Sequence, residues 1–306
     1  PEWMGRRLSD AAITYLEAPK EVRPRGARRV LARVSLPRPL LPGEQGELRL
    51  AFRTEIPKRR GRFGRYGGTV SLGGDFFPRP LPDLSGADTR KPPERASFTV
   101  RLSIPAGTGA VIHDRVFPIE ESRRTLEVDV ETDLLSSVVM ERMEIARAAL
   151  PFGEALYVSA RQRPRPFTYP DTRRGDDRGV PSNLPDLEDI DFASRAFSVL
   201  ETSASLLAEE SRGARLPERI VLVEIPAFDR LVSWGPGNTL VSDRLWGLVP
   251  FERALAFHDI ALAEALGASL AARATEGEPP ERRFLAAELV GARVRELYVA
   301  KAKGEA

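Results

Sequence analysis

Apolar and polar side chains alternate in short runs along the first half of the chain. Two clear examples are Phe98 to Ile104 and Leu126 to Val130, where every second residue is apolar. Successive side chains of a strand point to opposite faces, so this pattern predicts antiparallel strands with one face buried. Proline and glycine separate the runs, as at Pro105-Ala106-Gly107, and predict turns. We therefore expect residues 1–160 to form an antiparallel β-sandwich.

The pattern changes in the second half of the chain. Residues 161–190 are rich in Pro, Arg, Asp and Gly, which predicts an irregular connector. Apolar residues at helical spacing then predict a helix from Phe192 to Ser211. The run from Ile220 to Ile225 is apolar except for Glu224, as expected for a strand whose two faces are both covered.

Two more helices are expected towards the end of the sequence. The first spans about residues 250–274, and the second begins at Pro280, because proline suits the first turn of a helix. A glycine-rich loop from Trp234 to Asn238 precedes both. Residues 191–306 are therefore predicted to form an α/β domain.

The composition narrows the classes of function. The chain of 306 residues is 42% hydrophobic, and its 46 Lys and Arg against 44 Asp and Glu leave a net charge of +2. A charge this small does not favour a nucleic-acid partner. Because the sequence has no cysteine, it excludes disulfides, thiolate metal sites and cysteine nucleophiles.

The sequence assigns no cellular compartment. No apolar stretch approaches the roughly 18 residues that a membrane-spanning helix needs, and no signal peptide is visible. Pro1 stands where a reading frame would begin with Met, so we expect the chain to be a piece of a longer protein. Membrane association would then depend on flanking sequence.

Basic and aromatic residues gather between Lys58 and Tyr66, a mixture that can bind phosphate groups and stacked bases. The members are Lys58, Arg59, Arg60, Arg62, Phe63, Arg65 and Tyr66. The glycines among them and the strand-like flanks favour a solvated hairpin instead. We expect no nucleic acid to bind there.

A degenerate metal motif lies within the first of the two C-terminal helices. His258 begins the pentapeptide His258-Asp259-Ile260-Ala261-Leu262. In the zinc-protease pattern H-E-x-x-H, both histidines bind zinc from one helix face and the glutamate acts as general base. Here Asp259 replaces the glutamate and Leu262 replaces the second histidine. The chain contains two histidines in all, His113 and His258, so no intact motif can occur within it.

The order of these segments resembles the alanyl-aminopeptidase family of gluzincin zinc metallopeptidases. The segment from Ala96 to Pro105, and Gly73-Gly74-Asp75-Phe76-Phe77-Pro78 before it, are similar to parts of that family's N-terminal β domain. The later strand, glycine-rich loop and His258 helix follow in the order of its thermolysin-like domain. The resemblance implies a saddle-shaped β domain over 1–160 and part of a thermolysin-like α/β domain over 191–306.

The resemblance also implies metal-site roles for single residues. His258 falls on the first zinc ligand, Leu262 on the second and Asp259 on the general base. By spacing, Glu281 falls on the third zinc ligand, whereas a small insertion would select Glu288 instead.

A substrate-binding role is implied for the glycine-rich loop. Gly237 and Asn238 lie where the family's G-A-M-E-N loop holds the amino terminus of a substrate. The glutamate of that loop has no counterpart in this chain. The resemblance thus implies a degenerate substrate site beside a degenerate metal site.

These departures favour an inactive protein. A catalytic zinc site needs three protein ligands and an open position, and leucine cannot bind a metal. Asp259 is shorter than glutamate by roughly 1.5 Å, which displaces a general base from its water. We therefore expect a catalytically inactive relative of zinc aminopeptidases, without a cofactor, that binds a peptide or protein.

Two other functions stay open from the sequence. One is an active zinc metallopeptidase whose missing ligand comes from an unusual position such as Glu264, Glu281 or Glu288, or from sequence outside this chain. The other is a structural domain of a larger membrane-associated assembly. Each candidate residue also has a structural interpretation: His258 and Asp259 suit a polar position on a packed helix, and an acidic residue such as Glu281 favours the first turn of a helix.

Overall fold

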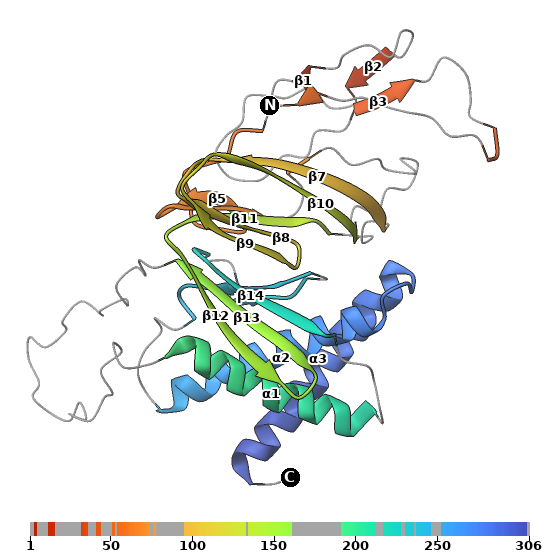
Figure 1. The fold of residues 1–306 in the computed structure, drawn as a ribbon. Coiled ribbons are helices and arrows are strands. Elements are labelled where there is room, and N and C mark those ends of the chain that lie inside the picture. The colour runs from red at the N-terminus through yellow and green to blue at the C-terminus, as the bar shows by residue number, and fades with distance from the viewer. Residues whose placement is uncertain are drawn as a thin grey trace, which may run out of the picture. The chain divides into compact units, whose positions relative to one another are not determined.

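The computed structural model of the chain consists of two compact units, Pro1–Glu55 and Ile56–Ala306 (Figure 1). The described residues are 3–4, 12–15, 32–35, 41–43, 51–52, 54–73, 76–77, 95–132, 134–160, 191–211, 217–227, 230–235, 237–245 and 252–304. In the first unit, two antiparallel strand pairs are described. They are β1 (Trp3–Met4) with β4 (Ala51–Phe52), and β2 (Ala12–Tyr15) with β3 (Ala32–Ser35).

The second unit begins with a five-stranded antiparallel sheet in the order β5-β6-β11-β8-β9. Its strands are β5 (Phe63–Tyr66), β6 (Thr69–Gly73), β8 (Thr108–Ile112), β9 (Arg115–Glu120) and β11 (Ser136–Glu141). The strands β7 (Ala96–Ile104) and β10 (Arg124–Thr132) form a separate antiparallel pair with Leu126 opposite Leu102. In β10 the apolar residues are buried and those between them are exposed, so the predicted alternation is confirmed there.

A second five-stranded sheet follows in the order β12-β13-β14-β16-β15. Its strands are β12 (Met143–Leu150), β13 (Gly153–Ala160), β14 (Arg219–Ile225), β15 (Val232–Ser233) and β16 (Thr239–Ser242). The three central strands run parallel, and the two edge strands are antiparallel to their neighbours. As predicted, β14 is covered on both faces: Leu222 belongs to one apolar core and Val223 to another.

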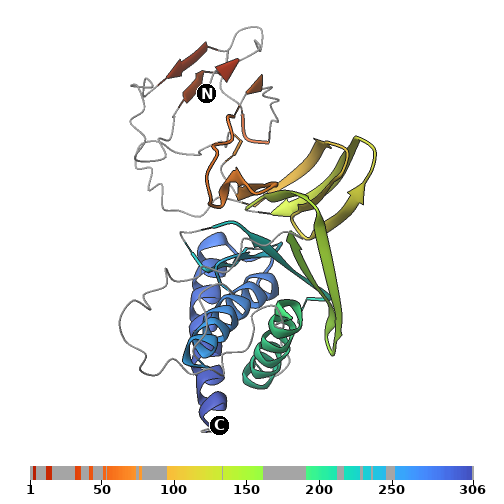
Figure 2. The same cartoon turned by 90° about the vertical axis from the view of Figure 1, so that its left-hand side faces the viewer.

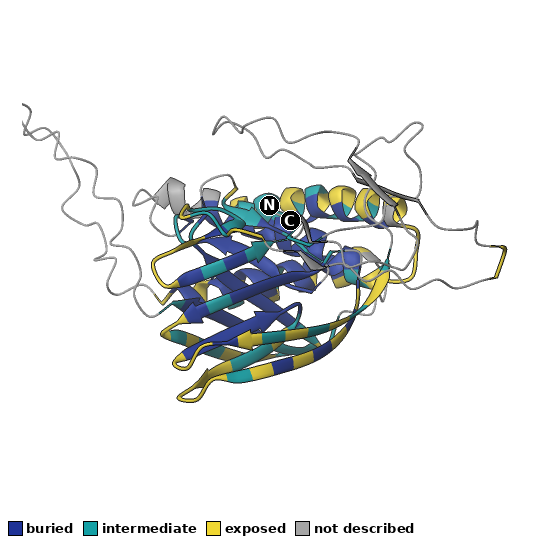
Figure 3. Cartoon of the chain, turned by 90° about the horizontal axis from the view of Figure 1, so that it is seen from above, coloured by how far each residue is buried: buried dark blue, intermediate teal, exposed yellow. Residues whose placement is uncertain are grey.

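Three helices cover one face of this second sheet (Figure 2). They are α1 (Phe192–Ser211), α2 (Glu252–Ala274) and α3 (Pro280–Lys303). The opposite face packs against Val111, Val138 and Met140 of the first sheet, so buried residues line both sides of the second sheet (Figure 3). None of the helices in the described part of the chain is long and apolar enough to cross a membrane.

Local chemistry sets the ends of the helices. Asp191 precedes α1, and its Oδ1 accepts hydrogen bonds from the backbone N–H groups of Ala193 and Ser194 at 3.1 and 3.3 Å. These contacts satisfy donors that have no partner within the helix. At the other end of the helical region, α3 begins with a proline and ends at Gly304, whose φ of 73° is left-handed.

The fold agrees with the expected β-rich part followed by an α/β part, and the three predicted helices are present at the predicted places. Two strands differ from the expected arrangement. The strands β12 and β13 precede residue 160 in sequence, yet they lie in the same sheet as β14 because β13 pairs with β14 in parallel. The expected connector over 161–190 lies outside the described residues.

The contact between α2 and α3 depends on close approach at Gly291. A Cβ atom added to Gly291 would lie 2.8 Å from the backbone oxygen of Glu264 and 3.1 Å from the Cβ of Ala268. Real Cβ atoms do not approach a backbone oxygen so closely, and α2 would have to move away. The two helices can therefore pack at their present distance only while position 291 has no side chain.

We expect Gly291→Ala to destabilise the protein by about 1–3 kcal/mol, because the added methyl group overpacks the α2–α3 contact. In an exposed helix the same change stabilises by about 0.5–1 kcal/mol. The sign of the change in unfolding free energy, measured by urea denaturation, therefore separates the two cases. A more stable variant would contradict the close packing.

Candidate functional site

Asp259, the residue at the general-base position, is bound by an arginine from another helix. It is buried near the start of α2, and its Oδ1 accepts a hydrogen bond from Nε of Arg195 on α1 at 3.0 Å. The Nη2 atom of Arg195 donates to Oδ2, so the pair is bidentate. Paired, parallel hydrogen bonds of this kind fix the orientation of a carboxylate. Asp259 thus holds α2 to α1.

A tyrosine from the third helix completes this polar cluster. Burial, assisted by the negative charge of Asp259, raises the pKa of Tyr298 on α3, while Arg195 acts in the opposite direction. The hydrogen bond from Arg195 to Asp259 in turn raises the pKa of the guanidinium. The cluster therefore contains a carboxylate, a guanidinium and a neutral phenol, contributed by three different helices.

His258 lies beside this cluster and is 2% exposed. Burial lowers the pKa of its imidazole, and the neighbouring Asp259 opposes that effect more weakly. A lowered pKa keeps the ring neutral near pH 7, which is the form that binds metals. Four residues further along α2, Leu262 is fully buried in the apolar core beneath the second sheet.

The two glutamates predicted for the third ligand position lie on the exposed side of α3. Glu281 is exposed in the first helical turn, and Glu288 is exposed and accepts a hydrogen bond from Nε1 of Trp234 at 3.4 Å. Among the residues that the structure describes, no three His, Cys, Asp or Glu side chains are arranged to hold a metal ion. The donors available beside His258 therefore do not fit a zinc site with three protein ligands.

The loop residues predicted to hold a substrate are both buried against the turn between β8 and β9. The Nδ2 of Asn238 donates to the backbone oxygen of His113 at 2.5 Å and to Oγ of Ser136 at 2.8 Å. A side chain at Gly237 would collide with the imidazole of His113. The backbone oxygen of Gly237 accepts a hydrogen bond from Arg273 of α2 at 2.8 Å. Here Gly237 and Asn238 connect the two sheets and α2; their predicted substrate role stays a prediction.

Sequence reasoning missed Arg195 and Tyr298. They lie in helices whose apolar pattern is ordinary, and 64 positions separate Arg195 from Asp259. No short motif joins residues that far apart. The sequence offered one signal: Asp259 lies in a helix whose apolar residues predict burial. A buried carboxylate requires a hydrogen-bonding or charged partner, although the signal does not say which residue it is.

The arrangement of these elements is similar to that of solved M1 zinc metallopeptidases. No protein-family model and no curated protein matches the sequence. Solved structures match it over nearly its whole length. The M1 zinc metallopeptidase of Deinococcus radiodurans is 18% identical, with a TM-score of 0.51, and a mutant form of that protein is 19% identical, with a TM-score of 0.52.

Each of these alignments covers 99% of this chain but 62% of the other. The chain therefore spans less than two thirds of the length of the M1 structures that it matches. At this level of identity the likeness concerns the fold, and it confirms the fold resemblance expected from the order of segments in the sequence.

We expect the Arg195–Asp259 pair to be strongly coupled. Arg195→Ala leaves a buried carboxylate without its main partner and should cost about 2 kcal/mol, below the range for fully buried pairs because Arg195 is partly exposed. The double variant Arg195→Ala/Asp259→Ala should lose less unfolding free energy than the two single variants lose together. The difference, which is the coupling energy of the pair, should be about 1 kcal/mol or more. Urea denaturation of the four proteins measures it.

The exposed pair of Arg293 and Glu210, at 3.0 Å, is a matched control between α3 and α1. Both partners are solvated, so we expect no measurable coupling there. Equal coupling energies in the two pairs would contradict the conclusion that the Arg195–Asp259 pair holds α2 to α1.

Proposed function

We propose that this chain is a catalytically inactive relative of zinc aminopeptidases that binds a peptide or protein through a retained thermolysin-like scaffold. The observation that carries the proposal is the position of Leu262. An apolar side chain fills the core at the place where the resemblance implies a second zinc ligand. Without that ligand, His258 is the single histidine donor of α2.

The state of Asp259 supports the same proposal. A general base must reach a water molecule with a free lone pair and an adjustable proton affinity. Here a bidentate guanidinium holds both carboxylate oxygens of Asp259. That arrangement engages both of the oxygen atoms that would act on water, which suits a structural role better than proton transfer.

The binding part of the proposal rests on the exposed surface of α3. Phe284, Leu285 and Leu289 are 52%, 58% and 62% exposed, which is unusual for three large apolar side chains on adjacent turns. The exposed carboxylates of Glu281 and Glu288 lie on the same helix, each about one turn from Phe284 and Leu285. A partner that complements this surface is a peptide segment with apolar side chains flanked by lysine or arginine.

The second candidate is an active zinc peptidase with a replacement ligand, and the M1-like fold favours it. Its ligand would come from Glu264, Glu281 or Glu288. Glu264 is bound to Arg295 at 3.2 Å, Glu288 accepts a hydrogen bond from Trp234, and Glu281 is exposed on α3.

We expect protein purified without chelators to contain no stoichiometric zinc and to hydrolyse no aminoacyl p-nitroanilide. Elemental analysis of the wild type, of His258→Ala and of His113→Ala, with circular dichroism to verify folding, tests this. About one zinc per chain, lost in His258→Ala and kept in His113→Ala, together with hydrolysis of the p-nitroanilide, would establish the second candidate instead.

The binding surface can be tested with a displayed library of random peptides selected on the full chain. We expect selected peptides to be enriched in apolar and basic residues and to lose binding to the Leu285→Ser/Leu289→Ser variant. The matched control is Ala302→Ser, at an exposed position on the same helix. Peptides that bind the wild type and the double variant equally would show that α3 is not the binding surface.

A further inference from the structure

The second sheet has two edge strands, β15 beside the glycine-rich loop and β12 at the opposite edge (Figure 1). An edge strand directs backbone N–H and C=O groups away from the sheet, and these groups can pair with a strand of another chain. Among the strands that the structure describes, β13 is the one neighbour of β12. The outer edge of β12 is therefore a candidate site for the addition of a strand.

The strand β12 lacks the features that protect the other edges of the two five-stranded sheets. β5 has four residues and β15 has two, whereas β12 has eight. β9 contains Pro118, which has no N–H group, and its pairing with β8 shifts register between Thr108 and Ala110. The register of β12 with β13 is continuous, and β12 contains no proline. It is the long and regular edge strand of these two sheets.

The hydrogen bonds of β13 show which residues of β12 face outwards. The backbone N–H of Glu154 donates at 2.8 Å to the oxygen of the residue that precedes β14. Because the backbone groups of successive strand residues point in opposite directions, those of Ala155 face β12, where its partner is Ala148. Arg147 and Ala149, on either side of Ala148, therefore direct their N–H and C=O groups away from β13. Both residues are exposed.

A row of charged side chains crosses the sheet at Arg147. Its Nη1 donates to Oε1 of Glu154 on β13 at 3.1 Å, and Nε of Arg219 on β14 donates to Oε2 of the same carboxylate at 3.0 Å. Two guanidinium groups thus share one carboxylate, and the Arg147 side chain is 65% exposed. Glu144, the other charged residue of β12, points to the opposite face. Since opposite charges on neighbouring strands stabilise a sheet, the row favours an acidic residue on a strand added beside β12.

The other face of β12 favours apolar side chains. Ala146 and Leu150 pack against the core beneath the sheet, and α1 contacts β12. Apolar side chains of an added strand extend this layer and are removed from water there. Successive side chains of a strand alternate between its two faces. The partner that fits β12 therefore has an acidic residue between two apolar residues.

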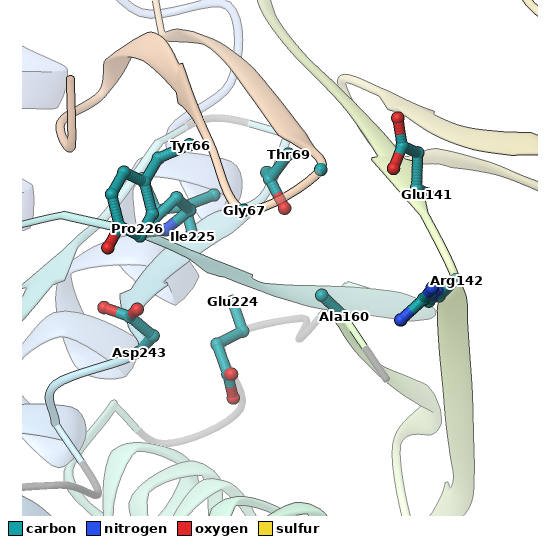
Figure 4. A pocket seen from close by; sticks show the side chains of 11 residues that line it. Tyr66, Gly67, Thr69, Glu141, Arg142, Ala160, Glu224, Ile225, Pro226 and Asp243 are labelled. Atoms are coloured by element: carbon teal, nitrogen blue, oxygen red, sulfur yellow. The ribbon is translucent and has the colours of Figure 1, made fainter. Parts of the chain in front are cut away.

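The cavity beside the turn that precedes β12 is not part of this surface. It has a volume of about 410 Å³, and Tyr66, Glu224 and Asp243 are among the residues that line it (Figure 4). Arg60 donates to Asp243 at 3.0 Å and lies over the Tyr66 ring, and Tyr157 donates to Glu224 at 2.6 Å. The polar groups of the cavity thus bind one another or nearby residues of the chain, whereas the backbone groups at the outer edge of β12 point away from the sheet.

We propose that the outer edge of β12 binds an extended peptide segment of another protein by strand addition. The backbone of the peptide pairs with Arg147 and Ala149. Its acidic residue lies beside Arg147, and the apolar residues on either side of it lie next to Ala146 and Leu150. This edge shares no residue with the peptide-binding surface proposed on α3, so either proposal can fail without the other.

Fluorescence anisotropy with the labelled peptide Thr-Thr-Val-Glu-Val-Thr-Thr tests the proposal, and the peptide with Lys in place of Glu is its matched probe. We expect the full chain to bind the acidic peptide more tightly than the basic one by about threefold or more, because Arg147 attracts one and repels the other. The variant Arg147→Glu should reverse this preference. Equal affinities in the wild type would contradict the proposed role of Arg147.

A proline at position 149 tests the backbone pairing itself. Ala149→Pro removes an N–H group that faces outwards and leaves the hydrogen bonds between β12 and β13 in place, so it should weaken binding of the acidic peptide about tenfold or more. The matched control Ala149→Ser keeps the N–H group and should bind like the wild type. Circular dichroism verifies that both variants are folded.

Amide hydrogen exchange tests the same pairing without a substitution. We expect the bound acidic peptide to slow exchange of the Arg147 and Ala149 amides in the wild type. The proposal is overturned by binding without this protection, by equal binding to folded Ala149→Pro and Ala149→Ser, or by no binding to the wild type. Loss of binding in Leu285→Ser/Leu289→Ser but not in Ala149→Pro would place the peptide on α3 instead.

Discussion

Burial of β14 on both faces is the constraint on which the second unit depends. Leu222 points into the core beneath the helices and Val223 into the core shared with the first sheet, and neither is exposed to solvent. Each such side chain stabilises the fold by about 1.5–3 kcal/mol. Because the strand serves two cores at once, both layers must be in place before its burial is complete. The helices and the first sheet are therefore energetically joined through one strand.

Asp259 of α2 has the acidic group that the resemblance implies at this position, but its contacts indicate a different role. Asp259 is a carboxylate where the resemblance implies a catalytic carboxylate, yet its partner is a guanidinium from α1. A buried charge that is paired contributes little net stability, whereas an unpaired one is costly. The pair therefore specifies which face of α1 meets α2 more than it strengthens the contact. Specificity of packing between α1 and α2 is the property that these atoms supply.

Periodic features of the sequence predicted the helices and strands well. They could not predict which residues far apart in the sequence are in contact. The helices at 192–211 and from Pro280, and the doubly covered strand at Ile220–Ile225, follow from spacing and from a proline. Pairing of β13 with β14 did not follow, because 58 residues lie between Ala160 and Arg219 and no local pattern records which strands meet. The same limit explains why Arg195 was not predicted as the partner of Asp259. Asp243 and Arg60, 183 positions apart, are a further example.

The parallel pairing of β13 and β14 also has a consequence for the kinetics of folding. Closing such a long segment costs chain entropy before any strand contact forms, and structures dominated by such contacts fold slowly. The α2–α3 hairpin, joined by the short turn from Thr275 to Pro279, has no such cost. The helices can therefore assemble early, before β14 pairs with β13 to complete the sheet that they cover. During that interval the apolar face of the hairpin is exposed, and the protein is most vulnerable to aggregation.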